Sequence, residues 1–201
     1  MKKTLEIRNL SYSFGDNSIL KDINIYVKEN EMVAIVGSSG VGKSTLFNLI
    51  AGVLKKQSGE ITIDGNNDYI GKVAYMLQKD LLFEHKTIIN NVILPLIIAK
   101  VDKKIALEEG RKILKQFNLE KYADKYPKQL SGGMRQRVAL IRTYMFKRNI
   151  FLLDEAFSAL DAITKKELHK WYLNLKKEFN LTTLLITHDI EEAIFLSDRI
   201  Y

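Results

Sequence analysis

The residues best suited to chemistry form one stretch, which fits the pattern G-x-x-x-x-G-K-[ST] in full: Gly37-Ser38-Ser39-Gly40-Val41-Gly42-Lys43-Ser44-Thr45. Its glycines allow backbone conformations that other residues avoid, so successive N–H groups can turn inward around a polyphosphate. Lys43 can then reach the β- and γ-phosphates, while the Ser44 hydroxyl can ligate Mg²⁺. The stretch therefore predicts a loop that binds a polyphosphate together with Mg²⁺.

A pair of carboxylates, Asp154 and Glu155, follows the apolar run 150–153. If that run is a buried strand, both acids lie at its carboxyl end, where open α/β sheets bind ligands. Asp154 would hold the Mg²⁺ shell, and Glu155 could orient and deprotonate an attacking water. The two acids predict hydrolysis as well as binding.

A third candidate is the start of a helix at Ser131-Gly132-Gly133. Ser131 can cap the helix, but two glycines in the first turn cost it roughly 1 kcal/mol each relative to alanine. The two glycines would be explained if the backbone N–H groups of this turn, not covered by side chains, bind an anion. We therefore expect a second phosphate-binding point here.

The elements that must position these residues follow from hydrophobic periodicity. The apolar run Met32 to Val36 predicts a strand buried on both faces before the glycine loop, and Leu46 to Ala51 predicts a helix after it. Other strands are expected over these ranges: Thr4 to Ser13, Leu20 to Val27, Glu60 to Asp64, Lys72 to Leu77, Ile150 to Leu153, Thr182 to Ile186 and the residues from Asp198.

Helical patterns fill the middle and the end of the chain. Between Thr87 and Arg148 we expect one helix over Asn90 to Lys100, one capped by Asp102 and one capped by Ser131. Two more are expected later, at Thr164 to Phe179 and after Asp189, where Glu192 three residues on resembles a capping box. The apolar stripe around Trp171 is read as core packing.

Composition limits the class of protein. The chain has 201 residues, 46% hydrophobic content and no cysteine, which suits one soluble domain without disulfides or thiolate metal sites. No signal peptide is visible, and the longest apolar run, Val92 to Ala99, is far below the roughly 18 residues that span a bilayer. Any membrane role must then come through a partner. Because a strand begins near Asp198 and the sequence stops at Tyr201, we expect the domain to be truncated.

The net charge of +7 is concentrated in one region, since residues 100–148 hold 14 Lys and Arg against 5 Asp and Glu. This region could face anionic lipid headgroups, nucleic acid or another polyanion, or it could be an ordinary solvated surface. Composition alone leaves these readings open.

The motifs together resemble the nucleotide-binding subunits of ABC transporters, and the resemblance covers essentially the whole chain. They come in the order of that family: an aromatic that stacks on adenine, the Walker A loop, the Q-loop glutamine, the LSGGQ-like signature, the Walker B acids, the D-loop and the switch histidine. The matching residues are Tyr12, Gly37 to Thr45, Gln78, Leu130 to Gln136, Asp154-Glu155, Ser158 to Asp161 and His188.

The resemblance implies a fold and a division of the chain. The fold is α/β, a P-loop NTPase of the ABC-ATPase type, with a RecA-like core, a small antiparallel β subdomain and an inserted α-helical signature subdomain. A single domain would span 1–201, with 1–86 and 149–201 forming the β subdomain and core and 87–148 the helical subdomain.

It also assigns roles to residues. ATP and Mg²⁺ would be the cofactors, with Ser44, Gln78 and Asp154 on the metal. Glu155, His188, Lys43 and Gln78 would be catalytic. The nucleotide would further contact Tyr12, the loop from Gly37 to Thr45, Ser131, Gly132, Gly133, Gln136 and Asp161.

The partners follow from the same resemblance. The signature of one subunit covers the ATP of another, which implies a head-to-tail homodimer at the cytoplasmic face of the membrane. Permease subunits would bind it directly, an extracytoplasmic substrate-binding protein would act indirectly, and no nucleic acid is expected. The function implied is an ATPase that drives a bacterial importer.

Within the family, the signature and Walker B regions look most like ATPases of importers for nitrate, alkanesulfonates, taurine and pyrimidine precursors of thiamin. The sequence differs from the pattern of the family at two places that bear on the predicted solute and on the D-loop. Ala156 stands where proline usually follows the Walker B glutamate, and Lys79 to Lys86 lacks the prolines often found after the Q-loop.

Two other functions compete. A soluble ABC ATPase acting on DNA or ribosomes could use the basic region, but such proteins carry long coiled-coil insertions or two cassettes, whereas this chain has one uninterrupted cassette. A P-loop kinase for a small molecule would leave the signature and His188 unexplained.

Overall fold

The computed structural model describes residues 3–201, which form two compact units. The core unit comprises the described residues up to Tyr75, together with Asn149–Glu155 and His169–Tyr201. The helical unit comprises Met76–Arg148 and Ala156–Leu168. Each unit is described by itself.

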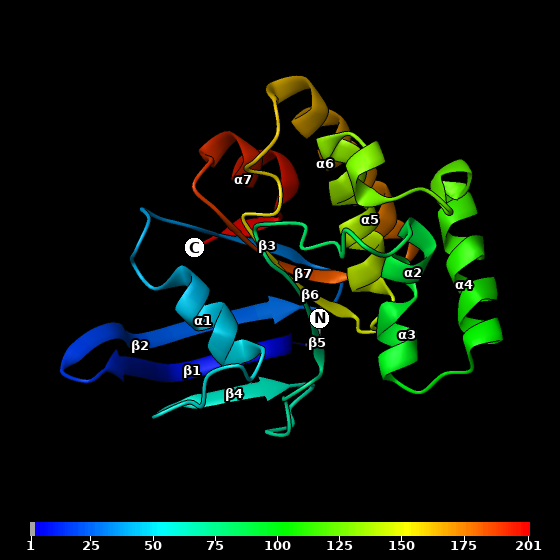
Figure 1. The fold of residues 1–201 in the computed structure, drawn as a ribbon. Helices are drawn as coiled ribbons and strands as arrows, with labels where there is room; N and C mark the ends of the chain where they lie inside the picture. The colour runs from blue at the N-terminus through cyan, green and yellow to red at the C-terminus, as the bar shows by residue number, and fades with distance from the viewer. Residues whose placement is uncertain (1–2) are drawn as a thin grey trace. The chain divides into compact units, whose positions relative to one another are not determined.

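The core unit begins with an antiparallel sheet in the order β2-β1-β4 (Figure 1). Its strands are β1 (Lys3–Phe14), β2 (Asn17–Lys28) and β4 (Glu60–Ile63). Ile7 of β1 pairs with Ile25 of β2 and with Ile61 of β4, and all three side chains are buried. This row of apolar side chains on one face follows from the alternation along each strand.

The second sheet runs in the order β5-β6-β7-β3-β8. Its strands are β5 (Val73–Met76), β6 (Ile150–Asp154), β7 (Thr182–Thr187), β3 (Met32–Val36) and β8 (Arg199–Ile200). Every residue of β6 and β7 is buried, as expected for parallel strands covered on both faces. The predicted strands are confirmed, with ends that differ from the prediction by at most three residues.

Register brings three carboxyl ends to the same edge of this sheet. Val36 of β3 pairs with Thr187 of β7, and Asp154 of β6 pairs with Ile186 of β7. Asp154 is the last residue of β6, and the glycine loop, Glu155 and His188 directly follow the ends of β3, β6 and β7. Parallel pairing therefore gathers segments that are far apart in the sequence.

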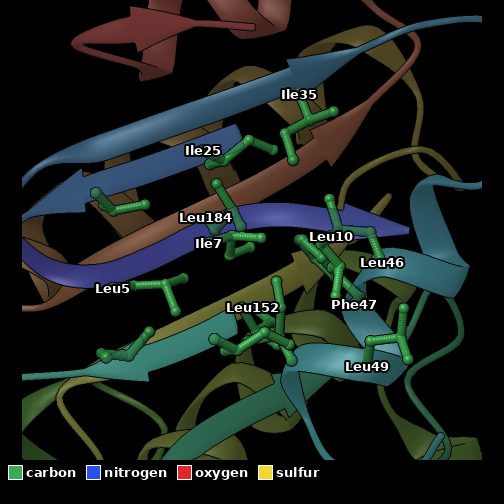
Figure 2. Packing of buried hydrophobic residues seen from close by; sticks show 14 of the residues in the cluster. Leu5, Ile7, Leu10, Ile25, Ile35, Leu46, Phe47, Leu49, Leu152 and Leu184 are labelled. Atoms are coloured by element: carbon green, nitrogen blue, oxygen red, sulfur yellow. The ribbon is translucent and has the colours of Figure 1, made fainter. Parts of the chain in front are cut away.

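Helix α1 (Lys43–Ile50) packs against both sheets of the core unit. Figure 2 shows Phe47 of α1 beside Leu10 of β1, with Leu152 of β6 and Leu184 of β7 in the same cluster. All four side chains are fully buried, so the helix that starts at the glycine loop is fixed by core packing. Two further helices follow in the chain, α6 (Ala162–Glu178) and α7 (Ile190–Leu196).

The helical unit contains four α-helices before α6 and two short 3₁₀ turns: α2 (Ile88–Val92), α3 (Leu94–Ile98), α4 (Lys103–Gln116), η1 (Glu120–Tyr122), η2 (Pro127–Gln129) and α5 (Gly132–Tyr144). The predicted caps are confirmed, because the Asp102 side chain accepts from the N–H groups of Lys104 and Ile105, and the Ser131 hydroxyl accepts from that of Met134. Among residues 3–201, no helix is both long and apolar enough to cross a bilayer.

The single helix expected over Asn90 to Lys100 is wrong. The segment forms α2 and α3, separated at Ile93, with Pro95 in the first turn of α3. Proline has no N–H to donate to the carbonyl four residues earlier, so it favours the start of a helix over its interior.

Candidate functional site

The glycine loop connects β3 to α1 in the core unit. Gly40 and Gly42 have φ values of +83° and +98°, in the region that favours glycine. A Cβ added to Gly42 would also lie 2.8 Å from Ile19 Cγ2. Conformation and packing therefore both require glycine at position 42.

The N-terminus of α1 is open to an anion. Gly42 is its N-cap residue, and within the described chain no side chain caps this end and its first turn holds no acidic residue. The N–H groups of that turn have no intrahelical partner and carry the positive end of the helix dipole. This arrangement suits a phosphate group.

Lys43 adds a fixed cation to the loop. Its ammonium donates hydrogen bonds to the carbonyls of Gly37 and Ser38, both at 2.7 Å, and its residue is only 9% exposed. Ser38, Ser39, Gly40, Val41 and Ser44 are exposed, whereas Thr45 is half-buried. The loop thus combines a left-handed backbone at two glycines, an ammonium held by two carbonyls, and several exposed residues.

Asp154 lies buried at the end of β6. Burial raises the pKa of its carboxyl, hydrogen bonds from Ser44 and Tyr75 lower it, and the neighbouring Glu155 charge raises it again, so that the pKa stands above its usual range. The Tyr75 hydroxyl donates to Asp154 Oδ2 at 3.2 Å, and burial together with the Asp154 charge raises the pKa of Tyr75. Tyr75 was not predicted, because a tyrosine in a strand carries no sign of its partner.

The donor set fits Mg²⁺. Ser44 and Asp154 bring a hydroxyl and a carboxylate oxygen together, the hard ligands that Mg²⁺ prefers. The described residues contain no group of three or more His, Cys, Asp or Glu side chains that could hold a metal alone. Mg²⁺ usually takes one or two protein oxygens together with phosphate and water, and Ser44 with Asp154 supplies two.

Glu155 faces His188. Their side chains approach to 3.4 Å between Glu155 Oε2 and His188 Nδ1, and the histidine is the more exposed of the two. Glu155 has φ +47°, a conformation that is uncommon for a residue other than glycine, and its N–H donates to the Ile186 carbonyl at 2.9 Å. A strained acid beside a histidine at the edge of the sheet is typical of a functional site.

The position of Tyr12 does not favour stacking on a ligand. Its residue is 8% exposed and its ring belongs to the hydrophobic core, where it meets Phe14 edge to face at 5.0 Å. Phe14 is 52% exposed. The ring available to a ligand is therefore that of Phe14, which the sequence reading passed over.

Gly133 has a packing reason that was not foreseen. A Cβ there would overlap Thr164 Cγ2, so a side chain at this position would require Thr164, at the start of α6, to move. Gly132 has more room, with Leu160 Cδ2 at 3.4 Å from its added Cβ. Ser131 is exposed and caps α5.

Gln136 conflicts with its predicted contact to a nucleotide. The residue is 4% exposed inside the helical unit, and its Oε1 is buried without a hydrogen-bond partner among the described residues. This burial does not favour the predicted contact of Gln136 with a nucleotide, which stays a prediction.

Gln78 and Asp161 lie in the helical unit as well. Gln78 is exposed and its Nε2 is 3.4 Å from the hydroxyl of Ser158. Asp161 accepts hydrogen bonds from the N–H groups of Ile163 and Thr164, so it caps α6. The hydrogen bond with the Thr164 side chain is the main cause that lowers the Asp161 pKa. Their roles on a nucleotide stay predictions.

A cluster of charged side chains, not predicted from the sequence, joins the residues after Gln78 to α5. Arg135 binds Asp80 through two hydrogen bonds of 2.8 and 3.0 Å and binds Glu84 at 2.7 Å. Arg142 donates to the carbonyls of Asp80 and Leu81 at 2.6 and 2.8 Å. We call these four side chains (Asp80, Glu84, Arg135 and Arg142) the arginine clamp.

The capping box predicted at α7 is only half formed. The Asp189 side chain accepts from the Glu192 N–H, as expected. The Glu192 side chain does not return to the cap, however, but lies 3.1 Å from His169 Nε2 on α6, while the Asp189 N–H donates to the Thr187 hydroxyl. His169 is thus another residue that was not predicted from the sequence.

Comparisons with known proteins agree with this geometry. Residues 20–158 match the family model described as ABC transporter. The chain is 39% identical over 199 residues to the probable sulfate/thiosulfate import ATP-binding protein CysA of Chlorella vulgaris, covering 96% of this chain and 84% of that protein. It is 41% identical over 202 residues to the formylaminopyrimidine import ATP-binding protein ThiZ of Halalkalibacterium halodurans, covering 100% and 80%.

A solved structure is similar over the whole chain. It is cbiO1 from Clostridium perfringens, described as part of the ABC transporter complex cbiONQ, with a TM-score of 0.90 and 29% sequence identity, covering 100% of this chain and 84% of that one. Several bacterial sulfate/thiosulfate import relatives are longer, and the chain spans 56% to 63% of their length.

Proposed function

Since this chain belongs to the ABC transporter family, with the ABC-ATPase fold of an ATP-binding and ATP-hydrolysing subunit, we propose that it energises the import of a small solute. The observation that carries the proposal is the edge of the parallel sheet where β3, β6 and β7 present the glycine loop, Asp154-Glu155 and His188. Import would require membrane permease subunits as partners, in line with the import proteins and the transporter complex named for its relatives. The subunit would lie at the cytoplasmic face of the membrane.

The glycine loop holds the phosphates of ATP. Main-chain N–H groups from Gly37 to Thr45 surround them, and Lys43 exchanges its two carbonyl partners for the β- and γ-phosphates. Ser44 and Asp154 would hold Mg²⁺. The role of Gln78 on the metal stays a prediction from the sequence. The metal would neutralise charge on the phosphate oxygens. Phe14, rather than Tyr12, offers the exposed ring for adenine.

Glu155 acts as the general base. Its carboxylate accepts a proton from the attacking water, and its residue follows the buried strand β6 with a left-handed backbone. His188, at 3.4 Å, holds the Glu155 carboxylate in place on one side. Asp154 remains with the metal, so the two neighbouring acids have separate tasks.

A second subunit completes each site. Ser131, Gly132 and Asp161 would serve the nucleotide bound by the partner in a head-to-tail homodimer, with Gly133 needed for the packing of α5. The buried Gln136 is not counted among these contacts.

The solute belongs to the range named for the relatives. Two of them are named for import of sulfate or thiosulfate and of formylaminopyrimidine. The pyrimidine is in line with the sequence prediction of a thiamin precursor, whereas nitrate, alkanesulfonates and taurine have no particular support from these relatives. We propose a small oxyanion or a pyrimidine, delivered by an extracytoplasmic binding protein.

Substitution of Lys43 tests the ATPase. Lys43→Ala removes the ammonium that the phosphates need, so it should weaken ATP·Mg²⁺ binding and reduce hydrolysis by at least about 10²-fold. Lys55→Ala, at an exposed lysine outside the loop, is the matched control. Parent-level hydrolysis by Lys43→Ala would disprove the assignment of the loop.

Uptake tests the solute. A strain lacking the gene should lose uptake of one labelled solute among sulfate, thiosulfate and formylaminopyrimidine, and the parent gene but not Lys43→Ala should restore it. Unchanged uptake of all three would exclude the proposed solutes and leave the ATPase assignment standing.

A further inference from the structure

We propose that His169 and Glu192 form a positioning pair that fixes the first turn of α7 and thereby orients His188 toward Glu155. The inference rests on the proposed catalytic site and adds to it two residues that touch neither nucleotide nor water. Four steps within the core unit carry it.

The pair itself is buried. His169 Nε2 and Glu192 Oε2 are 3.1 Å apart, and their side chains are 6% and 2% exposed. Polar groups removed from water in this way are costly unless they bind one another with good geometry. A buried, directional contact at this position therefore restricts where α7 can lie relative to α6.

Helix α6 provides a fixed base for the pair. Tyr172, one turn beyond His169 on the same helical face, is completely buried, and its hydroxyl lies 2.7 Å from that of Thr183 in β7. This contact ties α6 to the strand that ends at Thr187, immediately before His188.

Helix α7 holds the imidazole of His169 with two of its residues. Besides the contact to Glu192, the ring of Phe195 stacks on it with centroids 5.9 Å apart and planes 29° from parallel. Glu192 and Phe195 are three positions apart and share a face. Because α7 has only seven residues, it depends on such tertiary contacts for its stability.

The position of Glu192 is linked to His188 through the hydrogen bonds that cap α7. The Glu192 N–H donates to Asp189, and the Asp189 N–H donates to the Thr187 hydroxyl, at 3.1 and 3.0 Å. His188 lies between Thr187 and Asp189, so both neighbours are fixed while its side chain reaches Glu155. Loosening Glu192 would release the cap and, with it, the orientation of His188.

Replacing the buried pair by apolar side chains distinguishes an effect on the orientation of His188 from an effect on the stability of the fold. The double variant His169→Leu with Glu192→Met removes both polar groups and keeps a packed interior, a change that is often neutral for folding. We expect its melting temperature and KM for ATP to match the parent and its kcat to fall by about 10-fold, the scale typical of lost outer contacts at a site. His169→Gln, which keeps an N–H donor for Glu192, should retain the parent kcat.

The NMR signals of the histidine rings report directly on the environment of His188. The chain has three histidines, His85, His169 and His188, so the ring signals can be assigned by substitution. The His188 signal should shift or broaden in the double variant and in His169→Asn, whose shorter side chain does not reach Glu192. It should be unchanged in His169→Gln and in the exposed control Lys170→Gln.

The outcomes distinguish this inference from the proposed site. If His188→Ala hydrolyses ATP at the parent rate, His188 is not part of catalysis and the proposed site is wrong. If His188→Ala is impaired but His169→Asn and the double variant keep the parent kcat and the parent His188 signal, the positioning pair is overturned. If the double variant does not fold, His169→Asn alone decides by the same two measurements.

Discussion

Asp154 shows how one residue can reduce stability for the sake of binding. Its carboxylate is 7% exposed at the end of β6, and the charge of Glu155 lies beside it. Both features disfavour the ionised form, while the hydrogen bonds from Ser44 and Tyr75 only partly compensate. A divalent cation at this carboxylate would remove the conflict.

Asp154→Asn should therefore stabilise the protein in the absence of Mg²⁺, because a neutral amide can keep the contacts to Ser44 and Tyr75 without the buried charge. The same change should slow Mg²⁺-dependent hydrolysis by on the order of 10²-fold or more. Thermal melts with and without Mg²⁺, beside a hydrolysis assay, check both parts. A variant less stable than the parent without Mg²⁺ would refute the argument from burial.

The residue types of the site could be predicted from the motif, but the burial and the packing contacts of each side chain could not. The glycine at position 42 follows from the motif, and the structure adds a φ of +98° and close contact with Ile19. Burial of Tyr12 and Gln136 depends on which side of a strand or helix packs inward, which the motif does not contain. The prediction that Tyr12 and Gln136 contact the nucleotide was therefore made without knowledge of their burial.

At the scale of elements, the arginine clamp joins the segment after Gln78 to the helix that begins at the signature. Burial alone would raise the pKa of Asp80, but the hydrogen bonds and charge of Arg135 outweigh it and lower the pKa below its usual range. A carboxyl with a lowered folded pKa contributes stability above its unfolded pKa, and loses it as pH falls through the folded value.

Asp80→Asn should consequently destabilise the protein by about 1.5–3 kcal/mol at neutral pH, the range for hydrogen bonds to charged groups. The difference from the parent should shrink as pH falls below about 4, where the parent Asp80 also loses its charge. Urea unfolding at several pH values measures it.

Asp124→Asn is the control for this experiment, because Asp124 forms an exposed ion pair with Arg111 at 3.3 Å. Such pairs contribute less than about 1 kcal/mol. An equal loss for both variants, or a pH-independent loss for Asp80→Asn, would contradict the role of the clamp.

Elements were predicted best where periodicity and caps agreed, as in α4 and α5 with Asp102 and Ser131. The predicted helix over 90–100 failed because the apolar pattern continues through Pro95 while the backbone cannot. Long-range polar pairs, such as Asp80 with Arg135 and His169 with Glu192, leave no periodic signal and became visible only with the fold.

At the scale of the whole molecule, the fold class was readable from the order of the motifs. The domain boundaries at 87 and 148 remain a prediction, as does the head-to-tail dimer. The proposed function needs that dimer, since Ser131 and Gly132 belong to a helix start that would face the nucleotide of another copy.

The central claim is that Glu155 activates water while the rest of the site holds ATP. Glu155→Gln keeps the shape of the side chain and removes the base, so hydrolysis should fall by about 10²–10⁴-fold while ATP affinity is kept. ATP would then persist between two subunits, and the closed dimer should accumulate.

The decisive measurement is size-exclusion chromatography of Glu155→Gln with ATP·Mg²⁺, together with its hydrolysis rate and ATP affinity. We predict a dimer that contains intact ATP and hydrolyses it at a small fraction of the parent rate. Hydrolysis at the parent rate would contradict the assignment of Glu155 as the base, and loss of ATP binding along with hydrolysis would assign the residue to holding the nucleotide or metal instead.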